Sequence, residues 1–371
     1  MAINLHTEIC DMLGIEYPVF AFNHCRDVTA AVSNGGGVGV LGAGGMSPEG
    51  MRAQVQWLRK NTDKPFGLDL LLPKAVPATG THDDLVSRIP KANIEFMDNL
   101  KKELGMPESN PGRSDRTDIM DIGVGGTAAS QMEQVEAICE LKPTIFAGGL
   151  GMNPEVVEMC HRAGIKVVSL VGNVRQAKRV AEWGVDIIVA QGTEAGGHTG
   201  KIGTLALVPL VVDAVKPIPV LAAGGIGDGR GLVAALALGA AGAWTGTIWL
   251  TAHENPIEDF IKDRLVAASA EDAVITRVHT GKTARSLKSK FIEYWEQPGA
   301  PEPLPAPFQS MYLPIPWSVS SEGADRTWER LGLHDWIGTP AGQVMALIKE
   351  RRPARQILYD MVSQAIDILE P

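Results

Sequence analysis

The sequence has little of several features that would assign a function class at once. Its four cysteines form no CxxC pair and no spacing that suits zinc, which indicates reduced thiols rather than a disulfide framework or a metal site. No dense run of lysine and arginine occurs and the formal net charge is −9, which argues against a nucleic-acid partner. No apolar run reaches the roughly 20 residues that span a bilayer, and no secretory signal begins the chain. We therefore expect a cytoplasmic protein with no membrane partner.

The chain has instead the composition of an ordinary globular protein with an excess of one residue. Of its 371 residues, 45% are hydrophobic and 21% are charged, which excludes disorder as the dominant state. A core of this size needs no disulfide or metal to hold it together. Glycine accounts for 41 residues, about 11% of the chain against a usual value of about 7%. These glycines cluster in short motifs, and the motifs indicate the function.

Short apolar runs alternate with amphipathic helical patterns along most of the chain. Fully apolar strands separated by helices pair in parallel with both faces covered, and eight of them favour a closed (β/α)₈ barrel over an open sheet. The runs lie at 17–22, 38–43, 65–72, 144–148, 166–171, 186–191, 219–224 and 242–246. Helical patterns lie at 27–34, 47–60, 154–163, 174–183, 204–214 and 229–239. We therefore predict an α/β protein built on a TIM barrel.

Two segments interrupt this alternation. Residues 74–117 follow the third strand and are longer than an ordinary loop, so we expect an inserted lid at the C-terminal face of the barrel. Residues 255–338 include the run QPGAPEPLPAPF, which we expect to lie extended against the body. Residues 339–371 predict a helix, broken at Pro353, that closes the barrel as its eighth. The expected organisation is a barrel of residues 1–254 interrupted by 74–117, a smaller helical and irregular subdomain of 255–338, and the C-terminal helix of 339–371.

The densest motif is VAQGTEAGGHTG (189–200), which directly follows the sixth predicted strand. Active sites of this fold lie at that end of the barrel. Paired glycines let the backbone approach a flat ligand closely, and they hold His198 on a constrained turn. An imidazole with a pKa of about 6.5 suits proton transfer, so His198 is the candidate catalytic residue. A merely structural role fits the histidines that lack this context, which are His6, His82, His253 and His334.

Two further glycine motifs follow the seventh and eighth predicted strands. AAGGIGDGRG (222–231) runs from a strand into a helix, and GAWTGT (242–247) ends the last strand. Loops at these two places build the phosphate site common in such barrels, where backbone N–H groups and a helix N-terminus face the anion. Gly224, Gly225, Gly246 and Thr247 are therefore candidate phosphate ligands. The alternative is a pair of tight turns with no ligand.

Three other patterns suggest functions that their context does not support. The GxGxxG match at 37–42 runs through a strand instead of leading from a strand into a helix, which is the opposite of a dinucleotide-binding fingerprint. TGKT at 280–283 lacks the leading glycine of a P-loop. We interpret the basic residues of 282–290 as a solvated helix face, with contact to an acidic substrate tail as the alternative.

Through these motifs the sequence resembles the nitronate monooxygenase (2-nitropropane dioxygenase-like) family of FMN-dependent barrels. The resemblance spans most of the chain, through AAVSNGGGVGVLGAG (30–44), KPFGLDLLLP (64–73), AQGTEAGGHTG (190–200), AAGGIGDGRGLVAALALGA (222–240) and the final helix. It implies FMN as the cofactor, a small-molecule substrate, and O₂ or NAD(P)H as the second reactant. The oligomeric state stays open, a homo-oligomer included.

The resemblance also implies roles for individual residues. The histidine of the GGH motif, His198 here, matches the family's acid/base or substrate-positioning group. The loop after the first strand would lie under the flavin ring, the residues around Gln191 and Gly196 would contact the ring or ribityl chain, and Gly225 with 244–247 would cradle the phosphate. The implied cofactor-binding residues are Ala21, Phe22, Asn23, Asp69, Gln191, Gly196, Gly197, Gly224, Gly225, Trp244, Thr245, Gly246 and Thr247, with no metal.

The sequence departs from better-known members of this family at three places. The loop after the first strand reads FNHC (22–25) instead of carrying a glycine–methionine pair, and Asp69 stands where an asparagine is usual. Leu170 and Val171 stand where some members place a lysine. An added carboxyl group and an absent lysine disfavour a negatively charged reduced flavin, unless Asp69 is protonated or turned away.

The leading hypothesis is an FMN-dependent oxidoreductase that oxidises alkyl nitronates with O₂. The alternative is an NAD(P)H-dependent FMN reductase that acts on an enone, a quinone or a CoA thioester, and a third hypothesis is a flavin-binding protein without turnover. His24, on the loop after the first strand, is the rival of His198 for the acid/base role. The sequence leaves open the physiological substrate and the choice between NADH and NADPH.

Overall fold

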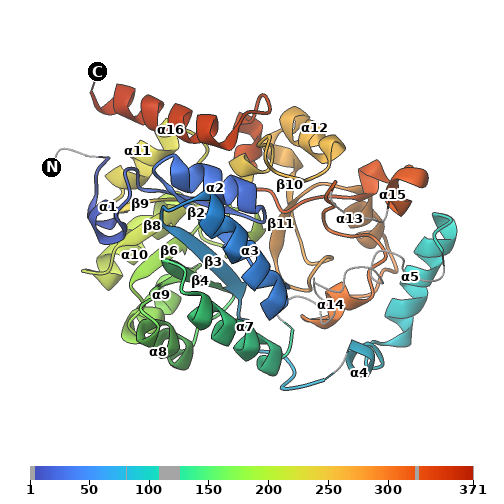
Figure 1. The fold of residues 1–371 in the computed structure, drawn as a ribbon. Coiled ribbons are helices and arrows are strands. Elements are labelled where there is room, and N and C mark those ends of the chain that lie inside the picture. The colour runs from blue at the N-terminus through green and yellow to red at the C-terminus, as the bar shows by residue number, and fades with distance from the viewer. Residues whose placement is uncertain (1–4, 81, 108–125, 322–325, 371) are drawn as a thin grey trace.

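The computed structural model describes residues 5–80, 82–107, 126–321 and 326–370, and its main feature is a closed barrel of parallel strands (Figure 1). Eight strands close the barrel in the order β1-β2-β3-β4-β5-β6-β8-β9. They are β1 (Val19–Asn23), β2 (Val38–Gly42), β3 (Phe66–Leu71), β4 (Ile145–Gly149), β5 (Lys166–Val171), β6 (Ile187–Gln191), β8 (Val220–Ala223) and β9 (Gly242–Thr245). All eight predicted runs form these strands, so the (β/α)₈ fold is confirmed.

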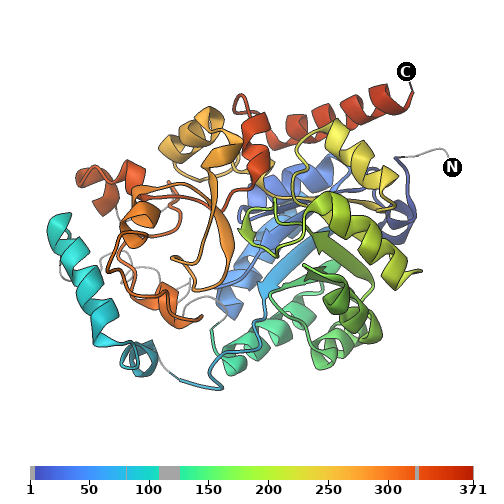
Figure 2. The ribbon, with the colours of Figure 1, turned by 180° about the vertical axis from the view of Figure 1, so that it is seen from behind.

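A ring of helices covers the outside of the barrel. The ring consists of α2 (Arg26–Asn34), α3 (Pro48–Asn61), α7 (Ala128–Leu141), α8 (Pro154–Arg162), α9 (Val174–Glu182), α10 (Thr204–Val215), α11 (Gly229–Ala237) and α16 (Ala354–Leu369). Helix α16 begins directly after Pro353 and packs against α11 and α2, which is the place of the eighth helix (Figure 2). Helix α16 therefore occupies the eighth position of the ring, whereas the part of the segment before Pro353 holds only the short 3₁₀ helix Gln343–Leu347.

Alternating side chains divide the barrel into an inner and an outer apolar layer. Phe20 belongs to the cluster inside the barrel, whereas Ala21, the next residue of β1, belongs to the cluster between strands and helices. This follows from strand geometry, because successive side chains point to opposite faces. Ile9 and Leu13 of the short helix α1 (Glu8–Leu13) join the inner cluster and cover one end of the barrel. The other end stays available for a site.

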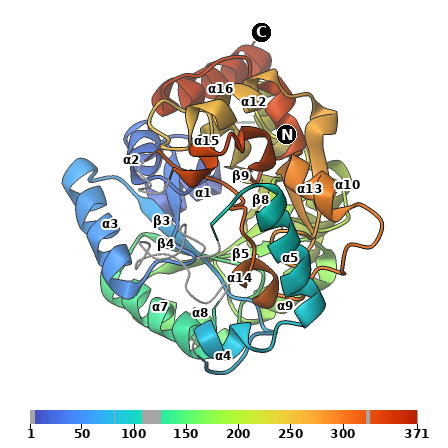
Figure 3. The same cartoon turned by 90° about the vertical axis from the view of Figure 1, so that its right-hand side faces the viewer.

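A second unit lies beside the carboxyl ends of the strands (Figure 3). Its elements are α4 (His82–Val86), α5 (Lys91–Glu103), α12 (Asp259–Ala267), β10 (Ala273–Thr276), β11 (Ala284–Leu287), α13 (Lys290–Trp295), α14 (Phe308–Met311) and α15 (Thr327–Arg330). A separate apolar cluster joins Met97 and Leu100 of α5 to Phe291 and Trp295 of α13. The segment after strand β3 therefore packs into the same core as residues from 257 onward. Residues 81 and 108–117 of the predicted insertion, and 322–325 of the subdomain, lie outside the described residues.

Two local features differ from the sequence expectation. The segment 282–290 holds strand β11 instead of a helix face, and β11 pairs with β10 and with the short strand β7 (Gly197–His198). The four residues of β11 are buried. Helices α4, α5 and α7, which we did not predict, follow β3. Among the described helices none is long and apolar enough to cross a membrane.

Candidate active site

A cavity of about 1630 Å³ lies between the carboxyl ends of the barrel strands and the second unit. Its barrel wall is made of strand ends and the loops that follow them, and its other wall comes from 255–257, 279–283, 310–320 and 327–344. Pockets for a single small ligand usually measure about 300–1,000 Å³. This cavity therefore has room for a cofactor and a substrate together.

The cavity brings together all but one of the residues selected from the sequence. Ala21 is the exception, because its side chain lies in the outer apolar layer and is fully buried there. The residues that line the cavity are Phe22, Asn23, Asp69, Gln191, Gly196, Gly197, His198, Gly224, Gly225, Trp244, Thr245, Gly246 and Thr247. The ends of the strands and their loops thus bring thirteen residues from distant parts of the chain together at one cavity. Their roles stay predictions.

His198 is held by contacts with both walls of the cavity. As part of β7 it pairs with Ala284 of β11, and its carbonyl accepts a hydrogen bond from Gln191 Nε2 at 3.1 Å. Its ring nitrogen Nε2 lies 2.9 Å from Thr280 Oγ1. The Thr280 hydroxyl can give its proton to the carbonyl of Lys282 at 3.4 Å, and in the tautomer that suits this arrangement Nε2 of His198 donates to Thr280. In that tautomer Nδ1 carries a lone pair, and it has no hydrogen-bond partner among the described residues.

The surroundings of His198 keep its imidazole neutral. Burial, together with the positive charge of Lys282, lowers the pKa of His198 to about 4. The ordinary pKa of about 6.5, on which the sequence argument relied, therefore does not hold in this cavity. At neutral pH the ring is a proton acceptor and not a proton donor.

Lys282 corrects our interpretation of 282–290 as a solvated helix face. Its side chain lines the cavity, and burial lowers the pKa of its ammonium group. The TGKT sequence is still not a P-loop, since it leads into strand β11 and not into a helix. The interpretation was wrong because β11 pairs with β7 in the sheet β10-β11-β7, and this pairing places the turn before β11 against the motif after β6.

Asp69 lies on β3 with its side chain 4% exposed, and it lines the cavity. Its backbone carbonyl accepts a hydrogen bond from Ala43 N, but its carboxyl group has no polar partner among the described side chains. Burial raises the pKa of this carboxyl group well above its ordinary value. A carboxyl group in that state is neutral and can donate a hydrogen bond. This favours the protonated form that the sequence left as one option.

The loop after β1 contributes an aromatic wall and a second histidine. Phe22 stacks on Trp244 with ring centroids 6.0 Å apart and meets His24 edge-on at 5.2 Å. Asn23 turns inward instead: its side-chain oxygen accepts from Cys25 N and its amide donates to the carbonyl of Ala21. Asn23 therefore builds the turn. His24 lines the cavity with its ring exposed to the cavity space, its Nδ1 lies 3.3 Å from the carbonyl of Gly42, and desolvation by the surrounding protein lowers its pKa.

The predicted phosphate cradle consists of two backbone turns with room beside them. Gly225 has φ +73°, and a Cβ there would meet only Glu194, at 3.6 Å. At Gly246 the nearest atoms to a Cβ are 3.9 Å away. The hydroxyl of Thr247 already accepts from Gly342 N at 2.9 Å. The N-terminus of α11 is not part of the cradle, because the carboxylate of Asp228 caps it through Gly231 N.

Gly196 has a packing role as well as its place in the cavity wall. A Cβ on Gly196 would lie 2.7 Å from the backbone of Ala341 and Gly342, so the motif after β6 approaches 341–342 as closely as glycine allows. Gln191 ends β6, and its amide nitrogen is engaged by His198. These two residues hold the GGH turn in place, whatever ligand they contact.

His279 is the site residue that sequence reasoning missed. It lines the cavity, is 3% exposed, and stacks on Trp317 with ring centroids 5.0 Å apart. Neither ring nitrogen has a hydrogen-bond partner in the described structure, and burial lowers the pKa of His279 to about 3. The signal in the sequence was a hairpin, because AVIT (273–276) and ARSL (284–287) flank a glycine-containing turn.

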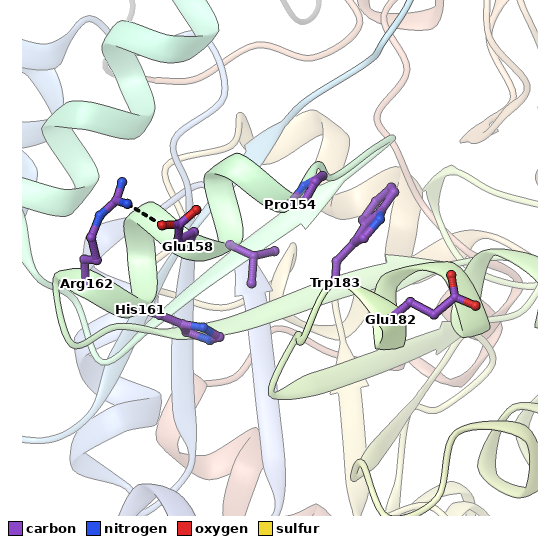
Figure 4. A pocket seen from close by; sticks show the side chains of 7 residues that line it. Pro154, Glu158, His161, Arg162, Glu182 and Trp183 are labelled. Atoms are coloured by element: carbon purple, nitrogen blue, oxygen red, sulfur yellow. Dashed lines mark hydrogen bonds and ion pairs between the residues drawn. The ribbon is translucent and has the colours of Figure 1, made fainter.

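A smaller hollow of about 590 Å³ lies on the surface at α8 and α9 (Figure 4). Its lining includes Pro154, His161 and Trp183, and its marked interaction is the ion pair of Glu158 with Arg162 on one helix face. None of the selected site residues lines it. We therefore place the active site in the large cavity.

Comparisons of sequence agree over the whole chain. A family model described as nitronate monooxygenase matches residues 6–363. A protein of Mycobacterium tuberculosis that bears the name of a monooxygenase is 40% identical over 370 residues, which are 98% of this chain and 97% of that protein. A protein of Staphylococcus aureus that bears the name nitronate monooxygenase is 28% identical over 378 residues, with 98% of each chain covered.

Comparisons of structure cover the second unit as well as the barrel. The nitroalkane oxidase from Streptomyces ansochromogenes superposes with a TM-score of 0.76 at 25% identity, covering 97% of this chain and 98% of that one. FabK from Thermotoga maritima superposes with a TM-score of 0.70 at 25% identity, covering 99% and 98%. Both similarities therefore include residues of both cavity walls.

Proposed function

Because the chain belongs to the nitronate monooxygenase family, we propose that it binds FMN in the large cavity and oxidises alkyl nitronates with O₂. Members of this family are oxidoreductases, and so is this protein. The observation that carries the proposal is His198, a neutral imidazole whose Nδ1 is unpaired in a cavity large enough for cofactor and substrate. When bound, FMN supplies the electron transfer between the substrate and O₂.

The residues of the cavity fit a flavin mononucleotide. The turns at Gly225 and Gly246 leave open space where side chains would otherwise stand, which suits the close approach of one phosphate to backbone N–H groups. Trp244 and Phe22 provide an apolar surface at the ends of β9 and β1. A neutral Asp69 adds no negative charge next to such a group. A second cradle for the pyrophosphate of a dinucleotide is not evident among the residues selected here.

His198 performs the proton step in this proposal. Its Nε2–H donates to Thr280, so Nδ1 can accept the proton from the carbon beside a nitro group and leave a nitronate. For a substrate that arrives as a nitronate, the ring positions the anion instead. The contact of its backbone with Gln191 and the pairing with β11 fix the ring between the two walls.

The test is reduction of the purified yellow protein under anaerobic conditions with a simple nitronate, propyl-2-nitronate. We expect rapid loss of the oxidised flavin absorbance, its return on admitting O₂, and release of FMN on denaturation. Recovery of FAD, or a colourless protein that cannot be reconstituted, would contradict the cofactor assignment. A flavin that stays oxidised with the nitronate would contradict the substrate.

A second candidate is an NAD(P)H-dependent FMN reductase with an enone, quinone or CoA-thioester substrate. The size of the cavity favours it, because about 1630 Å³ exceeds the needs of FMN and a small nitronate. The same anaerobic experiment separates the two: NADH or NADPH bleaches the flavin of a reductase within seconds and leaves that of a nitronate oxidase unchanged. A flavin that reacts with neither reductant would indicate a binding protein without turnover.

A further inference from the structure

The turn 279–283 of the second unit is fastened to the motif after β6 at several points. Thr199 N donates to the carbonyl of Thr283 at 3.3 Å, and Ala284 is the strand partner of His198. Thr280 Oγ1 lies 2.9 Å from His198 Nε2 and also meets Lys282, accepting from its N–H and donating to its carbonyl at 3.4 Å. The position of Lys282 relative to His198 is therefore fixed by the backbone and not by a flexible loop.

The ammonium group of Lys282 lacks an acidic partner among the described residues. No described carboxylate lies within ion-pair distance of it, and burial is the sole cause that lowers its pKa. Its charge acts on His198, whose pKa it lowers. A half-buried cation next to a neutral imidazole leaves a positive potential in the space between them.

The other titratable groups of the cavity do not cancel this charge. Burial favours the neutral forms of Asp69, His24, His198 and His279. The carboxylate of Glu194 accepts hydrogen bonds from the N–H and hydroxyl of Thr204, and its charge stabilises the Arg285 cation. Lys74 lies over the ring of Trp183 at 4.7 Å, and Arg179 and Lys201 are exposed at the rim. Among the described residues that line its inner part, the cavity therefore carries one positive charge without a counter-ion.

His279 adds a second unused group to the same turn. It directly precedes Thr280, is 3% exposed, and has no hydrogen-bond partner on either ring nitrogen in the described structure. A buried imidazole left without any partner is unfavourable, because it has lost its hydrogen bonds to water and gained none. A ligand that accepts hydrogen bonds would relieve this cost.

We propose that Lys282, on the turn 279–283, forms a binding subsite for a single negative charge and places the charged atoms of the substrate against His198. The ligand class is a small planar anion with its charge spread over oxygen atoms, such as a nitronate, a carboxylate or an enolate. The subsite deepens the proposed function, on which its choice of substrate rests, because a nitronate is such an anion. Lys282 also brings a positive charge into the cavity from the second unit. On β5, where some family members place a lysine, this chain has the uncharged Leu170 and Val171.

The test is calorimetric titration of the FMN-loaded protein with sodium nitrate, a planar anion that cannot turn over. We expect Lys282→Gln to weaken nitrate binding by about tenfold or more, which is the effect of losing a hydrogen bond to a charged group. Lys282→Arg keeps the charge and should bind nitrate within about threefold of the parent. Lys201→Gln removes a lysine from the rim of the same cavity and is the matched control, with a change below about threefold.

Two outcomes overturn the subsite. The first is a parent protein that binds no nitrate, and the second is a Lys282→Gln protein that binds it as tightly as the parent. If Lys282→Gln does not fold with FMN, Lys282→Met keeps the apolar stem without the charge and answers the same question. The failure of the proposed function is distinguishable, because nitrate binding that depends on Lys282 in a protein inert to nitronates refutes the nitronate substrate and leaves the anion subsite standing.

Discussion

His198 and Asp69 line the same cavity, and burial moves their pKa values in opposite directions. The imidazole loses its proton more readily and the carboxyl group keeps its proton more readily, because burial disfavours the charged form of each. Residue type alone suggests a histidine that titrates near neutral pH and a negatively charged aspartate. The structure instead favours the neutral form of both groups in the cavity that Lys282 also lines, which leaves the imidazole as the one of the two that can accept a proton.

Replacing His198 by alanine should remove turnover while FMN stays bound. Loss of a positioned acid or base typically lowers the rate by about 10²–10⁴-fold. His198 is part of the two-residue strand β7, whose backbone pairing does not depend on the side chain, so the fold should persist. Steady-state turnover and flavin content measured together check this. His24→Ala is the comparison, and an inactive His24→Ala beside a His198→Ala enzyme of near-normal rate would move the role to His24.

The pH dependence of kcat/KM with a neutral nitroalkane should follow the lowered pKa of His198. A base is active in its deprotonated form, and His198 with a pKa of about 4 stays deprotonated as the pH falls from 7. We therefore expect the acidic limb of the profile at about pH 4, well below the position that an ordinary imidazole near about 6.5 would give. A limb near pH 6.5 would show that the ring is not held in the buried state seen here.

Replacing Asp69 by asparagine should stabilise the protein, and the gain should depend on pH. The folded-state pKa of Asp69 lies well above its unfolded value. Asp69 therefore destabilises the folded state least below the unfolded pKa of about 3.9. The destabilisation grows as the pH rises towards the folded pKa. Asparagine does not titrate, so the midpoint of thermal unfolding should rise for Asp69→Asn at neutral pH and not at low pH. The exposed Asp63→Asn is the control, and equal shifts for both variants would contradict the argument.

At the scale of elements, the loops after β8 and β9 should hold the phosphate of FMN through their backbone. Gly225→Val would put a branched side chain where the anion must approach and should remove most of the FMN affinity. The backbone strain at φ +73° must be separated from this effect. Gly184→Val is the matched control, because Gly184 has φ +82° and no atom within 4 Å of a Cβ, and it lies outside the cavity lining. The FMN dissociation constant, measured by flavin fluorescence, should rise strongly above the parent value for Gly225→Val and stay close to it for Gly184→Val. Equal flavin occupancy in both variants would show that the cradle is elsewhere.

The barrel strands were predictable because each one is a continuous apolar run bounded by turns. Strand β6 is buried along IIVA (187–190), and β8 is buried along its whole length. The second unit lacks such a signal, since β10, β11 and α14 have four residues each and owe their form to tertiary packing. Local pattern therefore identifies the barrel wall of the cavity. The opposite wall, with His279 and Lys282, depends on pairing with β7 across more than 80 positions of the chain.

The position of α5 bears on the predicted domain organisation. Met97 and Leu100 are buried in the core of the second unit, and Asn93 Nδ2 donates to Tyr312 Oη at 3.0 Å. The segment 339–371 divides at Pro353, because Met345 packs in that second core and α16 packs on the barrel. We propose that the described part of the insertion folds with 255–338 as one unit, which makes it a fixed wall of the cavity more than a separate lid.

At the scale of the whole molecule, activity and stability draw on the same buried groups. The barrel holds the proposed cofactor loops, and the second unit brings Thr280, Lys282 and His279 over the strand ends. Joining the two walls buries His279 and partly buries His198, and this desolvation lowers the pKa of both rings. The cavity that keeps the imidazoles neutral therefore also makes the folded state sensitive to acid.

Stability should fall as the pH drops from about 6.5 to about 4, with FMN held at one saturating concentration. His198 and His279 have folded pKa values of about 4 and about 3, below the unfolded value of about 6.5. In this window the unfolded chain binds more protons than the folded one, so the free energy of unfolding decreases as the pH decreases. Asp69 works in the opposite direction with its raised pKa, and Asp186 and Asp272, with lowered pKa values, add to the loss at lower pH.

Urea midpoints measured from pH 8 to pH 4 should show the decline. His279→Phe, which keeps a ring on Trp317 without a titrating nitrogen, should flatten it, and an unchanged slope would show that His279 is solvated in solution.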